Sequence, residues 1–148
     1  MGHDFNTLPE HLQQAIRQAD GKEATMKRTR NKYNVSPAAE RTWRGRTYAS
    51  KAECEYARRL WSRFDTDVAE MIEQPRVTLT EGFVYHPDFL VILNDGKVYF
   101  VDVKGRETQR FRDAKRLWAA HGRLPLQVVK RARSGGFETT EIINSAGA

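Results

Sequence analysis

The sequence predicts an α/β fold, because segments with the period of strands and segments with the period of helices follow one another along the chain. Apolar, β-branched runs between turn residues are typical of strands, whereas apolar residues spaced three and four apart after a capping residue are typical of helices. A length of 148 residues suits one domain with an attached arm.

The N-terminal region differs in pattern from the rest of the chain. Thr7-Leu8-Pro9-Glu10 matches a capping box with proline in the first turn, which predicts a helix within residues 1–20. Residues 21–48 show no clear period and are strongly basic, so we expect a mobile basic arm or linker. The arm leads into a core at residues 49–143, and we expect a disordered tail at residues 144–148.

Capping patterns predict two helices in the core. Ser50 followed by Glu53 forms a second capping box, and Thr108 can cap a helix that runs to about His121 and ends at Gly122. Turn residues and apolar runs predict the strands between and after these helices. The expected strands span residues 76–80, 87–93, 97–103, 126–129 and 137–143.

The net charge of +6 is concentrated in one segment. Residues 21–49 hold eight basic and two acidic residues, which equals the whole net charge. Tyr33 and Trp43 are interleaved with these cations, so the segment is typical of a surface that contacts a sugar-phosphate backbone, although a solvated charged surface is the alternative. The candidate DNA contacts are Arg28, Arg30, Arg44 and Arg46 in this segment, and Arg106, Arg110, Arg112, Lys115 and Arg116 farther along.

Other classes of protein are disfavoured. No apolar stretch approaches the length of about 20 residues that a membrane helix needs, and the N-terminus lacks the pattern of a secretory signal. The lone Cys54 cannot form an internal disulfide, and no Cys/His cluster suggests zinc. We therefore expect a cytoplasmic protein without a membrane segment.

The most informative residues lie on two neighbouring strands. Asp88 opens the first strand, and Asp102 precedes Lys104 by two positions on the second, so Asp102 and Lys104 share a face. A three-residue loop at 94–96 would place Asp88 opposite Asp102, whereas a two-residue turn would place the carboxylates on opposite faces. Gly96 favours the three-residue loop, because its third residue adopts a left-handed conformation.

Glu53 has two possible roles. It can cap its own helix, or it can point into the core from the end of the apolar stripe that contains Ala57 and Leu60. Facing carboxylates repel one another, and a divalent cation that prefers oxygen ligands, Mg²⁺ or Mn²⁺, would remove the conflict. Lys104 could then position a water molecule or stabilise charge on a phosphate, which suits phosphodiester hydrolysis. For Asp102 and Lys104 alone, the alternative is an ordinary ion pair.

These residues resemble the PD-(D/E)XK nuclease superfamily. The resemblance consists of Glu53 on the first core helix, Pro87-Asp88 at the start of a strand, and Asp102 and Lys104 on its hairpin partner. Residues 85–90 and 101–105 further resemble the phage endonuclease I type of Holliday-junction resolvases, although those relatives favour glutamate at the position of Asp102. Residues 31–33 and 50–56 resemble a related group of small phage and prophage proteins with this nuclease core.

The resemblance implies a restriction-endonuclease-like core, with a mixed central β-sheet of four to five strands flanked by helices and a basic N-terminal arm outside it. It also implies that Mg²⁺, which Mn²⁺ may replace, is held by Glu53, Asp88, Asp102 and the carbonyl of Val103. Lys104 would act in catalysis.

The resulting hypothesis is a Mg²⁺-dependent DNA endonuclease of phage origin, selective for branched DNA. We expect it to act as a homodimer in the bacterial host cytoplasm without a small-molecule cofactor. The alternatives are a non-specific or nicking double-strand DNA endonuclease and a non-catalytic DNA-binding protein on a nuclease core. An RNA nuclease is disfavoured, because the sequence shows no recognisable aromatic stacking platform.

Overall fold

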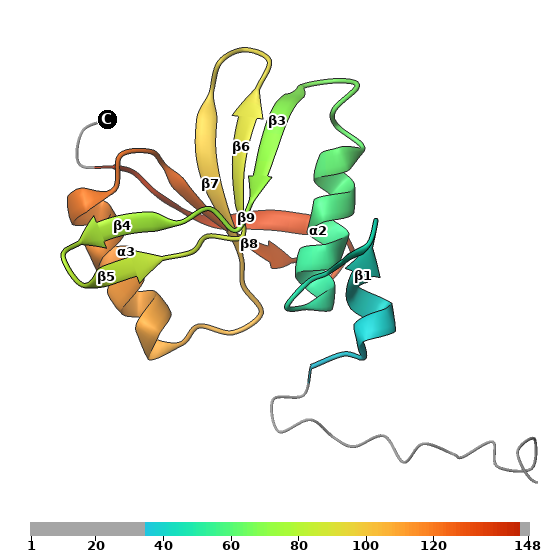
Figure 1. Cartoon of the computed structure of the whole chain (residues 1–148), viewed down its shortest axis with the longest axis horizontal. Coiled ribbons are helices and arrows are strands. Elements are labelled where there is room, and N and C mark those ends of the chain that lie inside the picture. Colours follow the sequence, from blue (N-terminus) through green and yellow to red (C-terminus); the bar gives the residue numbers. More distant parts are fainter. Residues whose placement is uncertain (1–34, 146–148) are drawn as a thin grey trace, which may run out of the picture. The chain divides into compact units, whose positions relative to one another are not determined.

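The computed structural model describes residues 35–145. The expected helix within residues 1–20, and the candidate contacts Arg28 and Arg30, lie outside this range. The described residues form an α/β fold with one five-stranded mixed sheet, two small two-stranded sheets and two α-helices (Figure 1).

The main sheet has the strand order β3-β6-β7-β8-β9. Strands β7 and β8 are parallel, and the other neighbouring pairs are antiparallel. A parallel pair needs a long crossover, and helix α3 (Gln109–His121) lies in this connection. The strands are β3 (Val68–Glu73), β6 (Phe89–Leu93), β7 (Val98–Val103), β8 (Leu126–Arg131) and β9 (Phe137–Ile143).

Both expected core helices are confirmed, together with their caps. Helix α2 (Lys51–Trp61) begins after Ser50, whose hydroxyl accepts a hydrogen bond from the backbone N–H of Glu53 at 3.1 Å. The hydroxyl of Thr108 accepts in the same way from Phe111, at 3.2 Å, at the start of α3. Each cap satisfies an N–H group that the first helical turn leaves without a partner.

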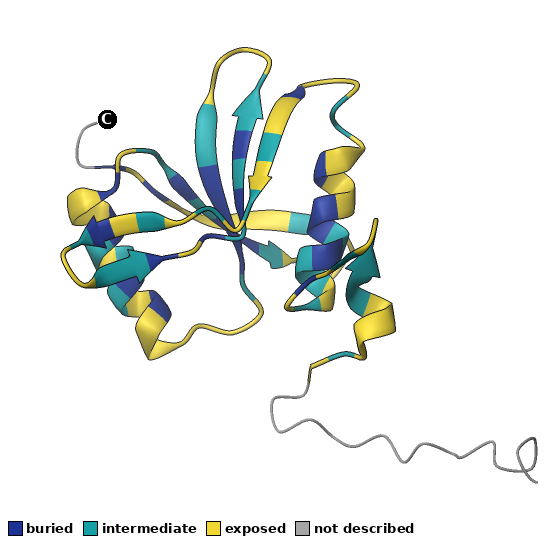
Figure 2. Cartoon of the chain, in the orientation of Figure 1, coloured by how far each residue is buried: buried dark blue, intermediate teal, exposed yellow. Residues whose placement is uncertain are grey.

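The two helices cover opposite faces of the sheet, as Figure 1 shows. Successive residues of a strand point to opposite faces. Accordingly, Val101 and Val103 of β7 pack in one core cluster with Leu60 of α2, whereas Phe100 packs in a second cluster with Trp118 of α3. Figure 2 shows buried residues on the central strands and on the helix surfaces that face them.

The described part of the expected arm is folded, so the boundary at residue 48 is wrong. A 3₁₀-helix (η2, Ala38–Arg41) leads into a hairpin of β1 (Thr42–Trp43) and β2 (Arg46–Thr47). Arg44 and Gly45 have φ angles of 49° and 77°, as in a two-residue turn whose central residues are both left-handed. Such a turn ties the segment together locally, and Trp43 packs against the α2 core cluster.

Three further features differ from the sequence prediction. Strand β3 was not expected, and β4 (Val77–Thr80) pairs with β5 (Phe83–Tyr85) in a sheet of its own. In the expected disordered tail, Ser145 is buried, so the fold extends to at least this residue. Among residues 35–145, no helix is both long enough and apolar enough to cross a membrane.

Trp118 provides a test of the α3 core cluster. Its side chain is completely buried, its ring contacts that of Phe100 with centroids 5.0 Å apart, and its Nε1 donates to the carbonyl of Leu124 at 2.8 Å. We expect Trp118→Ala to lower the free energy of unfolding by about 3–5 kcal/mol, measured by urea denaturation. The exposed Ile142→Ala should cost far less. Equal losses in the two variants would contradict the assigned core.

Candidate active site

The register of the β6–β7 hairpin agrees with the three-residue loop. The backbone N–H of Leu93 donates to the carbonyl of Lys97 at 2.8 Å, and Gly96 has a φ of 85°. The pairs run from Ile92 with Val98 to Phe89 with Val101. One further step along this register places Asp88 opposite Asp102, at the end of the hairpin away from the loop.

Asp88 is fixed through both its backbone and its side chain. Its Oδ2 accepts a hydrogen bond from the backbone N–H of Val103 at 2.7 Å, and its carbonyl accepts from the N–H of Gln74 at 2.8 Å. The first bond crosses the hairpin to β7, and the second reaches the residue that follows β3. The carboxylate is therefore held where three strands of the sheet meet.

Asp102 is a buried carboxylate with two partners. It is 1% exposed, and its Oδ1 lies 2.7 Å from the Nζ of Lys104. Its Oδ2 accepts a hydrogen bond from the hydroxyl of Tyr85, at the end of β5. The ammonium group of Lys104 also lies 4.6 Å from the ring centroid of Phe111, on α3. The ion pair offsets the charge of the buried carboxylate, but Oδ1 accepts no hydrogen bond within the described chain.

Glu53 combines the two roles that the sequence left open. The hydroxyl of Ser50 donates to its Oε1 at 3.1 Å, so its side chain belongs to the cap of α2. Burial raises the pKa of Glu53, the bonds at the cap lower it, and Lys104 and Asp102 act on it through their charges. The last two effects show that Glu53 lies within electrostatic reach of the hairpin carboxylates.

Burial and neighbouring carboxylates raise the pKa of Asp88. The pKa of Asp88 is raised from 3.8 to about 8, chiefly by burial and further by the neighbouring charges of Asp102 and Glu53. The hydrogen bond from Val103 and the charge of Lys104 act in the opposite direction but do not cancel the rise. One lysine therefore does not neutralise this group of acidic residues, which would bind a further cation favourably.

The donor set suits Mg²⁺ better than it suits a tightly chelated metal. Among residues 35–145, no three or more His, Cys, Asp and Glu side chains are arranged to hold a metal ion. Mg²⁺ requires fewer protein ligands, because it is usually held by one or two carboxylates together with water and substrate phosphates. Asp88 and Asp102 provide two such carboxylates next to Lys104.

The candidate DNA contacts are in different environments. Arg46 forms an ion pair of 2.6 Å with Glu73, and the guanidinium group of Arg110 lies 5.5 Å from the ring centroid of Phe83. Arg106 and Arg116 are exposed, and neither forms an ion pair with another residue of the described chain. These two cations are therefore available for a phosphate, and the exposed Arg44 also lies outside any ion pair of the described chain.

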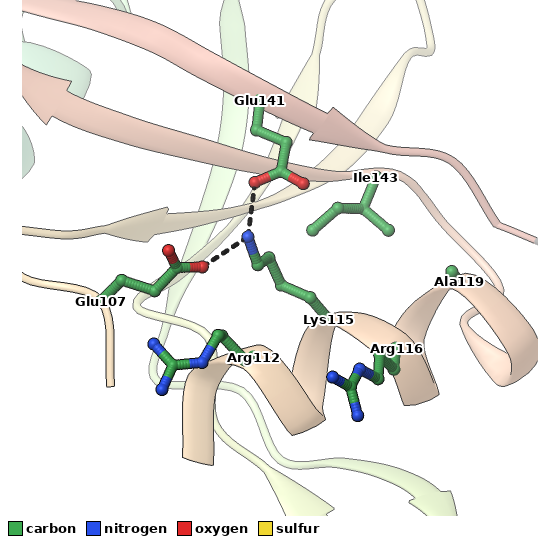
Figure 3. A pocket seen from close by; sticks show the side chains of 7 residues that line it. All are labelled: Glu107, Arg112, Lys115, Arg116, Ala119, Glu141 and Ile143. Atoms are coloured by element: carbon green, nitrogen blue, oxygen red, sulfur yellow. Dashed lines mark hydrogen bonds and ion pairs between the residues drawn. The ribbon is translucent and has the colours of Figure 1, made fainter. Parts of the chain in front are cut away.

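Lys115 lies in a shallow pocket between α3 and β9 (Figure 3). Its ammonium group lies 2.6 Å from Glu107 and 2.8 Å from Glu141, so two carboxylates already neutralise it. Arg112 lines the same pocket and donates to Gln109. A role of Lys115 in DNA binding would require a phosphate to replace one of these carboxylates.

Sequence reasoning did not assign a role to Tyr85. This residue belongs to the segment on which the resemblance rests, but its partner Asp102 is 17 positions away and in a different sheet. No local pattern indicates such a contact. The only signal available was a tyrosine just before the candidate site, since a buried tyrosine hydroxyl usually finds a hydrogen-bond acceptor.

The fold and the site define an α/β protein with a buried aspartate, a half-buried aspartate and a lysine at one end of its central hairpin. Residues 30–134 match the model of the DUF1064 family, described as a protein of unknown function, and the chain belongs to this family. The match covers α2, the hairpin, α3 and β8. No curated protein and no solved structure matches the chain.

The pKa of Asp88 predicts how stability depends on pH. The folded protein holds this proton more tightly than the unfolded chain does. The protonated form therefore stabilises the fold fully below the unfolded pKa of 3.8, and this contribution is lost as the pH rises through about 8. In EDTA, we expect the free energy of unfolding to fall with rising pH across this window, and to fall less in Asp88→Asn, whose amide cannot ionise.

Asp95→Asn is the matched control for this measurement. Asp95 is exposed in the hairpin loop, and hydrogen bonds from Lys97 lower its pKa. It is therefore ionised across most of the same window, from about pH 5 to pH 8, and its replacement should leave the pH dependence across that range unchanged. Equal slopes for the wild type and Asp88→Asn would contradict the assignment of a raised pKa to Asp88.

Proposed function

We propose that the chain is a Mg²⁺-dependent DNA endonuclease with a PD-(D/E)XK site. The observation that carries the proposal is the meeting of Asp88 and Asp102 at one end of the hairpin, with Lys104 lying 2.7 Å from Asp102. The mixed sheet between two helices is the arrangement that the resemblance implies, so the fold supports a restriction-endonuclease-like core.

The residues of the site would have different roles in phosphodiester hydrolysis. Asp88 and Asp102 would hold Mg²⁺, with Glu53 and the carbonyl of Val103 as further ligands. Mg²⁺ would supply a Lewis acid that shields the charge of the phosphate and makes water a better nucleophile. The side chain of Lys104 is 26% exposed, so its ammonium group can reach a phosphate and stabilise the charge that develops on the phosphate oxygens.

The proposed substrate is branched DNA, cut by a homodimer in the cytoplasm of a bacterial host. Support comes from the resemblance to the phage junction resolvases and from a net charge of +6, which favours a polyanionic partner. A nicking or non-specific double-strand nuclease would use the same core. It would differ only in how the DNA arms are held outside the acidic cluster.

One observation favours a second candidate of another class, a non-catalytic DNA-binding protein. Asp102 already has two partners, since its Oδ2 accepts a hydrogen bond from Tyr85 and its Oδ1 lies in an ion pair with Lys104. No group of three ligands is preformed within residues 35–145. An inactive site would keep these contacts permanently. In an active site, Asp102 would separate from Lys104 when metal and DNA bind.

Cleavage of branched DNA tests the proposed activity directly. The wild type should cut a four-way junction in Mg²⁺ faster than it cuts linear duplex or single strands of matching sequence. Asp88→Asn and Lys104→Ala should each reduce the rate by about 100-fold or more, because the first removes a carboxylate that would hold Mg²⁺ and the second removes a positive charge that acts on the reacting phosphate. The exposed Lys97→Ala, in the hairpin loop, should leave the rate unchanged.

The outcomes of the cleavage experiment separate the candidate functions. Equal cutting of junction and linear duplex would retain the nuclease and remove its junction selectivity. Tight binding of DNA without cutting in Mg²⁺ or Mn²⁺ would favour the non-catalytic protein. Cutting that survives Asp88→Asn and Lys104→Ala would place the chemistry elsewhere.

The hydrogen bond from Tyr85 to Asp102 provides a test of metal binding. Tyr85→Phe removes the donor that orients Asp102, and the loss of such a partner typically costs 10–100-fold in metal affinity or activity. We expect a higher Mn²⁺ concentration at half-maximal cleavage and a smaller rise in Tm on adding Mn²⁺. Tyr99→Phe, on β7 and packed against the α2 cluster, is the control. If both variants respond to Mn²⁺ as the wild type does, Tyr85 has only a packing role.

A further inference from the structure

An arginine–tryptophan stack of Trp43, Arg44 and Trp61 lies where the β1–β2 hairpin packs on the end of α2. The Cζ of Arg44 is 4.3 Å from the ring centroid of Trp61 and 5.3 Å from that of Trp43. The two rings meet edge to face, with centroids 5.9 Å apart and an angle of 73° between their planes. The guanidinium group is therefore fixed against two indoles before any ligand arrives.

The positive charge of this stack is not neutralised. Arg58 also approaches Trp43, with its Cζ 6.0 Å from the ring centroid. Within residues 35–145, neither Arg44 nor Arg58 forms an ion pair, whereas the nearby Arg46 is paired with Glu73. Two guanidinium groups at an exposed aromatic surface therefore keep N–H donors available for an anion.

Packing alone does not explain the exposure of the stack. Trp61 is 38% exposed, whereas Trp118 in the α3 core is completely buried. Arg44 occupies a turn position with a φ of 49°, where glycine or asparagine is favoured. An arginine at this position has an unfavourable backbone conformation, and it places its guanidinium group against the two indoles.

We propose that the arginine–tryptophan stack binds an unpaired nucleotide of a DNA strand. The phosphate accepts hydrogen bonds from Arg44, with Arg58 adding charge, and the base stacks on the exposed surface formed by Trp61 and the guanidinium plane. The inference rests on the proposed DNA substrate but not on cleavage. It also revises the expectation from sequence, because Trp43 and Trp61 form an aromatic platform only after folding.

The test compares two oligonucleotides of equal length, oligo-dT and its abasic counterpart, by fluorescence anisotropy in EDTA. The wild type should bind oligo-dT about 10-fold more tightly, because stacking requires a base. Trp61→Ala should abolish this preference. Arg44→Asn should weaken the binding of both oligonucleotides and reduce the slope of log affinity against log salt by about 0.7, as expected for one lost phosphate contact.

Matched variants keep the test informative. Arg44→Asn keeps a residue that tolerates a left-handed conformation at this turn. Trp61→Phe keeps an aromatic ring at the end of α2, so it should retain part of the preference for oligo-dT that Trp61→Ala loses. Arg123→Asn removes the same charge from an exposed residue just after α3, on the other face of the sheet, and should not affect the preference.

The outcomes separate this inference from the proposed function. Equal affinity of the wild type for oligo-dT and its abasic counterpart would overturn the stacking site, even if the protein cuts junctions. A lost preference in Trp61→Ala, without cleavage by the wild type, would support the stacking site and remove the nuclease. Tighter binding of oligo-U than of oligo-dT would overturn the assignment to DNA.

Discussion

The register between β6 and β7 is the constraint on which the candidate site depends. Side chains alternate between the two faces of a strand, so a shift of one residue would move Asp102 and Lys104 to the face covered by α2. It would also bring Val101 and Val103 out of the α2 core cluster. The three-residue loop that ends at Gly96 and the packing of two cores therefore specify the same register, and the positions of the charged groups follow from it.

Burial of acidic groups makes this site electrostatically demanding. Asp102 is almost completely enclosed, and the charges of Asp102 and Glu53 raise the pKa of Asp88. Lys104 and Tyr85 are the partners of Asp102, but they leave its Oδ1 without a hydrogen bond and Asp88 with a strong tendency to hold a proton. A fold gains nothing in stability from this arrangement, because apolar residues of similar size would pack at lower cost. Groups placed in this way are typical of functional sites, and a divalent cation is the partner that would relieve the repulsion.

Local signals were sufficient for much of the fold and for the charged part of the site. Ser50 and Thr108 carry their caps in the sequence, and Gly96 indicates the loop that sets the hairpin register. Contacts between distant segments were not predictable in this way. Strand β3 contains Ala, Met and two Glu residues, which favour helices, and it is a strand because it pairs with β6. The same limit applies to Tyr85 with Asp102, and to Trp43 with Trp61.

Helix α2 connects the candidate active site with the arginine–tryptophan stack. Glu53 lies in its first turn and Trp61 is its last residue, eight positions later, which corresponds to about 12 Å along the helix axis. A strand with a phosphate at Lys104 could thus present a nearby unpaired base to Trp61. Because one rigid helix sets this spacing, the distance between the cut and the held base would be fixed by the fold, which is a physical route to preferring branched over continuous duplex DNA.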